Sequence, residues 1–349
     1  MQTVHGGDIY SFQRSYNRPV VDFSANINPL GMPAAVRNAA RQAVEDCAAY
    51  PDPACHELTQ ALAVAEGVQP PRLICGNGAA DLIFRVVWAK APKRAVLVAP
   101  GFAEYEAALG AAGCAIEYEL LLEQEGFALT PRFLERLTPG VDMAFLCLPN
   151  NPTGTVVDEA LLHKIIRRCG QAGILLVLDC CFLAFLDAPP AIPKPLPPHV
   201  LLLNAFTKLY AMAGLRLGYG ICTDPGLLAA MHRCTQAWSV SLPAQAAGVA
   251  ALREKDYLEQ TRALIGSQRA FLTEGLRQRG MQVYGSQANF IFFRSMMPDL
   301  APRLAQQGIL IRGCGNYHGL DQNYYRVAVR TGEENRLLLA AIDQILAAV

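Results

Sequence analysis

The sequence lacks a surplus of charge, a long hydrophobic run and any familiar metal-binding motif. Its 30 Lys and Arg residues balance 30 Asp and Glu residues, so no net field favours nucleic acid or an anionic membrane surface. The longest strongly apolar run, GILLVLDCCFLAFL, has 14 residues and contains an aspartate, which makes it too short to span a bilayer. The first residues, MQTVHGGDIYSF, lack the basic and apolar regions of a signal peptide. We therefore expect a cytoplasmic protein without nucleic-acid or membrane partners.

Cysteine is abundant, but its spacing excludes the common cysteine-based sites. None of the 11 cysteines forms a CxxC pair, and none of the six histidines falls in an HExxH or HxH pattern. Most cysteines are scattered among apolar residues, which is typical of small buried side chains in a reducing compartment. We therefore predict no metal site. The sequence offers no physical reason for the adjacent pair Cys180 and Cys181.

Short apolar runs alternate with helix-length amphipathic segments along the first two thirds of the chain. Most of these runs are apolar throughout rather than alternating, as expected for parallel strands covered by helices on both faces. The order of strands and helices predicts a wound α/β sheet. The predicted strands are residues 72–75, 95–98, 143–148, 174–179, 200–204 and 216–222.

The pattern changes near residue 242. A long helical region extends to about residue 279, and the segments QVYGSQANFIFFRS, ILIRGCG and YYRVAVR then predict the strands of a smaller α+β unit, followed by a last helix. A chain of 349 residues is long enough for one large and one small domain. We predict an N-terminal segment (1–35), a large domain (36–241) and a small domain (242–349).

Polar residues follow several of the predicted strands, and ligands of open α/β sheets gather at the carboxyl ends of strands. Gly78, Ala79 and Ala80 come between a strand and a helix, where backbone N–H groups bind phosphate, although such a turn is more often only a turn. Asn151, in LPNNPTG, follows another strand, although Asn-Pro turns are common.

A carboxylate and a lysine follow the next two strands. Asp179 ends the most apolar strand, where its charge needs a partner, a helix cap or a backbone donor. Lys208 comes 29 residues later, and Arg216 eight beyond it. A buried lysine has a lowered pKa and reacts with aldehydes, whereas a lysine at a strand end is often only a surface charge. A cofactor with a phosphate, a pyridinium nitrogen and an aldehyde uses a helix N-terminus, a buried aspartate and a lysine together.

Several segments resemble a known family. LPNNPTG, LDCCF and FTKLYAMAGLRLGY resemble the fold-type I pyridoxal-phosphate enzymes, in the branch of histidinol-phosphate aminotransferases among the class I and II aminotransferases. HGGDIY, DFSANINPLGMP, YPDP, APGFAEYEAAL and ILIRGCGNYHGLDQNYYRVAVR are similar to the threonine-phosphate decarboxylases of cobalamin synthesis. The resemblance covers nearly the whole chain. It implies a large domain with a mainly parallel sheet between helices, a small α+β domain joined by residues 1–35, the cofactor pyridoxal 5'-phosphate, and a homodimer with shared active sites.

The resemblance also implies roles for individual residues. Lys208 would bind the cofactor covalently, Asp179 would pair with the pyridinium N–H, Asn151 would bond the ring hydroxyl oxygen, and Tyr105 would stack on the ring. The residues matching the phosphate site are Gly78, Ala79, Ala80, Thr207 and Arg216, with Tyr50 from a neighbouring subunit. The residues matching the substrate site are His5, Gly6, Asn26, Asn151, Arg312 and Arg326. Two arginines suit a substrate with two anionic groups, and which anion each one binds stays open.

The reaction implied by the resemblance is decarboxylation of O-phospho-L-threonine to (R)-1-amino-2-propanol O-2-phosphate for assembly of the cobalamin nucleotide loop. Phe182 favours this reaction, because many aminotransferases have tyrosine at that position and the decarboxylases tend to have phenylalanine. Three alternatives stay open. They are an aminotransferase for histidinol phosphate or a similar phosphorylated amine, a decarboxylase of O-phospho-L-serine, and an inactive pyridoxal-phosphate-binding protein.

Overall fold

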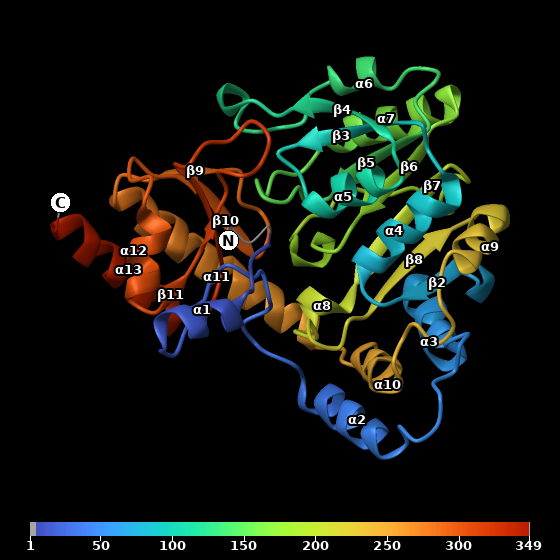
Figure 1. Ribbon diagram of the computed structural model, residues 1–349, viewed down its shortest axis with the longest axis horizontal. Helices are drawn as coiled ribbons and strands as arrows, with labels where there is room; N and C mark the ends of the chain where they lie inside the picture. Colours follow the sequence, from blue (N-terminus) through green and yellow to red (C-terminus); the bar gives the residue numbers. More distant parts are fainter. Residues whose placement is uncertain (1–4, 349) are drawn as a thin grey trace.

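The computed structural model describes residues 5–348, which form a large unit and a smaller unit (Figure 1). The strands are β1 (Val21–Asp22), β2 (Leu73–Gly76), β3 (Arg94–Ala99), β4 (Ala115–Leu120), β5 (Met143–Cys147), β6 (Leu175–Asp179), β7 (Val200–Ala205), β8 (Gly218–Cys222), β9 (Gln282–Tyr284), β10 (Phe290–Arg294), β11 (Ile309–Leu310), β12 (Arg312–Gly313) and β13 (Tyr324–Ala328). The α-helices are α1 (Ile9–Tyr16), α2 (Ala34–Glu45), α3 (His56–Glu66), α4 (Ala79–Lys90), α5 (Ala103–Ala111), α6 (Phe133–Arg136), α7 (Glu159–Ala172), α8 (Phe206–Leu209), α9 (Pro225–Arg233), α10 (Leu242–Ala251), α11 (Tyr257–Gln278), α12 (Leu300–Gln306) and α13 (Gly332–Ala347). The 3-10 helices are η1 (Pro70–Arg72), η2 (Glu123–Glu125) and η3 (Leu183–Phe185).

The large unit is built on a seven-stranded sheet with the order β2-β8-β7-β6-β5-β3-β4. Strands β7, β6, β5, β3 and β4 run parallel, whereas β8 is antiparallel to both of its neighbours. All six apolar runs that predicted strands are strands of this sheet. The sequence pattern did not predict β4, AIEYEL, because it lies at the sheet edge and its partly exposed residues include two glutamates.

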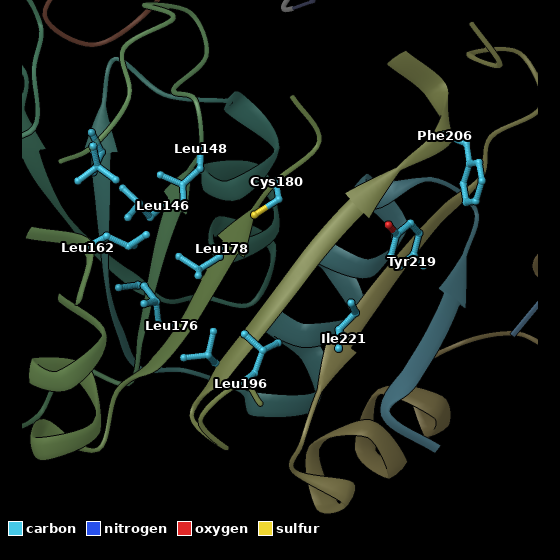
Figure 2. Close-up of a cluster of buried hydrophobic side chains, with 14 of the residues drawn as sticks. Leu146, Leu148, Leu162, Leu176, Leu178, Cys180, Leu196, Phe206, Tyr219 and Ile221 are labelled. Carbon is cyan, nitrogen blue, oxygen red and sulfur yellow. The ribbon is translucent and has the colours of Figure 1, made fainter. Parts of the chain in front are cut away.

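The central strands are apolar throughout because alternate residues enter two different cores. Leu146, Leu176 and Leu178 pack on one face of the sheet with Leu162 of α7 (Figure 2). Residues between them in sequence, such as Val177, enter the core on the other face, which α4, α5 and α9 cover. Because both faces are buried, the carboxyl ends of the parallel strands are left as the place where polar groups meet a ligand.

The smaller unit contains an antiparallel sheet with the order β12-β13-β10-β9. Its own core includes residues of the sheet together with Leu272 of α11 and Ile342 of α13. The N-terminal segment packs on this unit, because β1 pairs in parallel with β11 through Val21 and Ile309. Figure 1 shows α1 beside the C-terminal elements for this reason.

Helix α10 packs in the core of the large unit, although it begins at residue 242, where we predict the domain boundary. Ala244 and Ala247 of α10 share the large unit's core with Val36 of α2, and the two helices lie side by side (Figure 1). A Cβ at Gly248 would lie 2.8 Å from the Leu58 side chain of α3, so a larger residue would require this leucine to shift. The chain passes to the smaller unit after α10, in the turn that separates it from α11. The sequence pattern had joined the two helices into one region.

Within residues 5–348, no helix combines the length and the apolar character that crossing a membrane requires.

Candidate active site

A cavity of about 320 Å³ lies at the carboxyl ends of the large sheet's parallel strands and is closed by residues of the N-terminal segment and of β13. Parallel strands end at one edge of a sheet, so residues that follow β5, β6 and β7 meet there. Eleven of the residues predicted to form the site line this cavity. They are His5, Gly6, Asn26, Ala79, Ala80, Asn151, Asp179, Thr207, Lys208, Arg216 and Arg326.

Lys208, on the short helix α8, is the lysine that lines the cavity among the described residues. Burial of the side chain, with the positive charges of Arg326 and Arg216 nearby, lowers the pKa of Lys208 from 10.5 to about 8. About a tenth of the amine is therefore neutral at pH 7, far more than for an unburied lysine, and only the neutral amine attacks an aldehyde.

Asp179, at the end of β6, is 4% exposed and is held by two donors. The backbone N–H of Cys181 donates to Oδ1 over 3.0 Å, and the Tyr105 hydroxyl donates to Oδ2 over 2.6 Å. Burial and the neighbouring Asp179 charge raise the pKa of Tyr105 well above its usual value, so its hydroxyl stays a proton donor. The carboxylate thus has a fixed position from which to bind a cationic N–H.

Tyr105 lies outside the cavity lining. It is buried inside α5, where its ring stacks on Phe145 at 4.8 Å, and it is not among the residues that line the cavity. The aromatic residue at the cavity wall is Phe102, which precedes α5 and meets the Tyr105 ring edge-on at 5.5 Å. In this structure Tyr105 holds Asp179 and its ring does not face the cavity, so the stacking role implied for Tyr105 stays a prediction. Phe102 and Tyr105 both belong to the segment PGFAEY. The residue at which α5 begins decides which of the two rings faces the cavity.

The N-terminus of α4 and Arg216 form an anion site. A Cβ at Gly78 would lie 2.7 Å from Arg216 Nη2, and a Cβ at Gly218 would lie 2.5 Å from the backbone nitrogen of Ala79. The glycines therefore let the guanidinium and the free N–H groups of the helix approach the same space, which suits a phosphate. Arg216 has a φ of 59°, a left-handed conformation that costs a non-glycine residue energy and that aims its side chain at this space. The hydroxyl-bearing Thr207 also lines the cavity.

Arg326 is the cationic group on the opposite wall. It is 5% exposed, donates from Nη2 to the Ser24 carbonyl over 2.8 Å, and donates from Nη1 to Asn151 Oδ1. Its Nε and the Oδ1 of Asn26 are buried without a hydrogen-bond partner in the protein. Buried polar atoms in native proteins are almost always satisfied, so these two atoms have unused hydrogen-bonding capacity in residues that line the cavity.

Arg312 lies next to the cavity rather than in it. It pairs across β12 and β13 with Arg326, but its side chain lines a neighbouring cavity of about 360 Å³, and His5, Gly6 and Ser24 line both cavities. Arg312 donates to the Gly313 carbonyl and to Asn316 Oδ1 over 2.7 and 2.8 Å. The structure therefore brings Arg312 close to the predicted substrate site without exposing it to the main cavity.

Tyr50 lies outside the cavity of its own chain. It is 77% exposed, and its ring stacks on Trp238 at 4.3 Å. The role implied for it in a neighbouring subunit's site stays a prediction.

Nine residues that line the cavity were not among the predicted site residues: Ser24, Ala25, Phe102, Glu104, Cys147, Cys181, Phe182, Ala205 and Tyr317. Burial raises the pKa of the Cys181 thiol well above its usual value, and the nearby Asp179 charge adds to this effect, so the thiol stays protonated. Glu104 and Tyr317 carry no pattern in the sequence, because each belongs to a surface segment that only the fold brings to the cavity. In the part of the chain that the structure describes, no three His, Cys, Asp or Glu side chains gather in a way that could hold a metal ion.

The wound sheet, the buried lysine and aspartate, and the anion site at α4 define a class of protein. The chain belongs to the aminotransferase class I and II family, whose model matches residues 18–342. Its fold is the predicted fold-type I, with a mainly parallel sheet flanked by helices.

Individual relatives sharpen this assignment. The chain is 41% identical over 335 residues to the threonine-phosphate decarboxylase of Salmonella typhimurium, covering 95% of this chain and 92% of that one. It is 28% identical to the adenosylcobalamin biosynthesis bifunctional protein CobDQ of Leptospira interrogans, covering 98% of this chain and 41% of that one. Among solved structures, the histidinol-phosphate aminotransferase of Sinorhizobium meliloti in complex with pyridoxal-5'-phosphate is 25% identical, with a TM-score of 0.84 and coverage of 97% of this chain and 94% of that one.

Proposed function

We propose that the protein is a pyridoxal-phosphate-dependent decarboxylase that converts O-phospho-L-threonine to (R)-1-amino-2-propanol O-2-phosphate for cobalamin biosynthesis. The identity to the Salmonella threonine-phosphate decarboxylase and the likeness to an adenosylcobalamin biosynthesis protein support the substrate and the pathway. The observation that carries the proposal is the layout of one cavity. Lys208, Asp179 and the anion site lie on one side of it, and Arg326 and His5 lie on the other.

The residues of the large unit fit the cofactor. Lys208 would hold its aldehyde carbon, Asp179 would face its pyridinium nitrogen, and the N-terminus of α4 with Thr207 and Arg216 would hold its phosphate. When bound, the cofactor supplies an electron sink for the bond that breaks at the substrate Cα.

The protein's own groups decide which bond at Cα breaks. Arg326, with its unsatisfied Nε, binds an anionic group of the substrate and fixes the orientation of Cα. The orientation of Cα would decide whether the carboxylate leaves as CO2 or the hydrogen leaves as a proton, and Lys208 Nζ would be the base for the second outcome. With a pKa of about 8, Lys208 is largely protonated near neutral pH, and its ammonium group would return a proton to Cα after CO2 leaves.

Product analysis tests the proposal. The purified enzyme is incubated in parallel with O-phospho-L-threonine, O-phospho-L-serine and histidinol phosphate, with and without 2-oxoglutarate. Release of CO2 from phosphothreonine without a 2-oxo acid is the expected result. Conversion of 2-oxoglutarate to glutamate with histidinol phosphate would instead identify an aminotransferase. Phosphoserine differs from phosphothreonine by one methyl group, which an apolar pocket discriminates only modestly, so we expect slower turnover of phosphoserine.

We further infer a cytoplasmic homodimer in which each subunit completes the other's site. The exposed aromatic pair of Tyr50 and Trp238 supports an interface at this surface, since large exposed aromatic side chains are typical of interface residues. All 11 cysteines lie within the described residues, and none of them forms a disulfide bond. Free thiols suit a reducing compartment. Sedimentation of the wild type and of Tyr50→Ala tests the dimer: a wild-type monomer at micromolar concentration would contradict it.

A further inference from the structure

We propose that Glu104 and Glu106, in the first turn of α5, are positioning residues that hold the substrate side of the cavity in place through two histidines. The inference rests on the proposed function, since the groups being positioned are those that would meet the phosphorylated substrate. Neither glutamate needs to touch the cofactor for this role.

The first contact joins the N-terminal segment to α5. His5 Nε2 lies 2.6 Å from Glu104 Oε1, and the imidazole also packs against the Phe102 ring at 5.6 Å. Both His5 and Glu104 line the main cavity, so the contact lies at its wall. The hydrogen bond from His5 lowers the pKa of Glu104, which keeps this carboxylate charged. A carboxylate in a cavity for an anionic substrate is repulsive by itself, and pairing with His5 offsets that repulsion.

The N-terminal segment connects His5 to Arg326 through Gly6 and Ser24. Gly6 is pressed against Ser24 so closely that a Cβ on it would lie 2.1 Å from the Ser24 carbonyl oxygen. The same carbonyl accepts the hydrogen bond from Arg326 Nη2. The position of His5 is therefore coupled through two backbone contacts to the cationic group of the opposite wall.

The second contact joins the loop between β12 and β13 to α5. His318 Nε2 lies 3.0 Å from Glu106 Oε2, and its ring lies against Tyr118 of β4 at 4.6 Å. The preceding residue, Tyr317, lines the cavity, and its ring lies 5.1 Å from the Arg312 guanidinium. The anchored histidine thus fixes the loop that places Tyr317 at the cavity wall and beside Arg312.

The side chains of Glu104 and Glu106 leave helix α5 on different sides. Residues two apart on an α-helix point about 200° apart, so Glu104 faces the cavity while Glu106 faces the sheet edge at β4. The histidines are about half exposed, with side-chain exposures of 46% and 53%. Ion pairs at such exposed positions contribute little to global stability. Their effect therefore falls on the placement of the N-terminal segment and of the loop between β12 and β13 rather than on the stability of the fold.

The test uses the holoenzyme with the variants Glu104→Gln and Glu106→Gln, and with Glu135→Gln as a control for an exposed glutamate elsewhere. We expect each of the first two to raise KM for O-phospho-L-threonine roughly fivefold, with kcat changed less than about twofold. The visible spectrum of the bound cofactor and Tm should match the wild type, and the control variant should change none of these values.

A double-mutant comparison decides whether the glutamates act through the histidines. Adding Glu104→Gln to His5→Ala, or Glu106→Gln to His318→Ala, should raise KM no further. An unchanged KM in both single variants, or a full additional effect in the histidine backgrounds, would overturn the proposal.

Hydrogen exchange separates this inference from the proposed function, because it needs no substrate. Backbone amides of residues 5–8 and 314–320 should exchange faster in the glutamine variants than in the wild type. If wild-type enzyme fails to decarboxylate phosphothreonine, the proposed function fails while faster exchange still supports the positioning role. Unchanged exchange in both segments would refute the positioning role even in an active decarboxylase.

Discussion

The cofactor side of the cavity belongs to the seven-stranded sheet, whereas the substrate side is carried by the N-terminal segment, β13 and the loop that precedes it. Lys208 and Asp179 stand at the ends of strands that are buried on both faces. His5 and Tyr317 stand on irregular segments whose contacts with α5 are partly exposed. We call the side that carries Lys208 and Asp179 the rigid wall, and the side that carries His5, Tyr317 and Arg326 the adjustable wall. Strand ends buried on both faces suit covalent chemistry, whereas surface segments suit selection of a substrate.

Removal of Lys208 tests the rigid wall and should have the largest effect. Lys208→Ala should lower kcat by roughly 10⁴-fold or more, because no other amine of residues 5–348 lines the cavity to replace it. Turnover of phosphothreonine and the absorbance of bound cofactor are the measurements. Some cofactor should remain bound through the contacts at α4 and Arg216. The exposed Lys164 of α7 provides the control variant, and full activity of Lys208→Ala would contradict the assignment.

The two arginines test the adjustable wall. Arg326→Ala should raise KM roughly 30- to 100-fold, since it removes a buried charge-assisted contact. Arg312→Ala should raise KM less, because its side chain lines the neighbouring cavity. Steady-state kinetics with phosphothreonine give both values, and the cofactor spectrum should stay unchanged. A larger effect from Arg312 than from Arg326 would mean that the substrate reaches the second cavity.

The pKa of Lys208 predicts how the rate of cofactor uptake depends on pH. Only the neutral amine reacts, so uptake of pyridoxal 5'-phosphate by cofactor-free protein should rise with pH and level off above about pH 8. Well below that pH, each decrease of one pH unit should lower the rate of uptake roughly tenfold. Stopped-flow absorbance measures it. A rate that keeps rising to about pH 10.5, the value of an unburied lysine, would show that burial does not lower this pKa.

Tyr105 gives the smallest effect and refines the description of the rigid wall. Tyr105→Phe removes the donor to Asp179 but keeps the ring that packs on Phe145, so kcat should fall only about three- to tenfold. Phe102→Ala should instead weaken cofactor binding, because Phe102 is the aromatic residue at the cavity wall. Equilibrium binding of the cofactor to both variants distinguishes them. Cofactor binding as tight in Phe102→Ala as in the wild type would contradict the assignment of Phe102 as the ring at the cavity wall.

The rigid wall was predictable from the sequence because its geometry follows from one rule. Continuously apolar runs mark buried parallel strands, and the polar residues that follow them meet at one sheet edge, as Asn151, Asp179 and Lys208 do. Strand β4 was not predicted, because an edge strand is only half buried and its sequence is not apolar throughout.

The features of the fold and site that the sequence did not predict depend on tertiary packing. Whether Phe102 or Tyr105 faces the cavity depends on where α5 begins, and that start has no side-chain cap to mark it. The boundary near α10 depends on an alanine-rich helix packing on α2, which no periodicity of α10 alone reveals. Glu104 and Tyr317 reach the cavity through contacts between segments far apart in the chain.

The pairing of β1 with β11 has a consequence for protein synthesis. Val21 leaves the ribosome long before its partner Ile309. At ordinary translation rates, the N-terminal segment waits on the order of tens of seconds for the strand that receives it. The large unit can therefore acquire its cofactor-binding wall while translation continues. The substrate-binding wall is assembled last, when the first and last parts of the polypeptide finally meet.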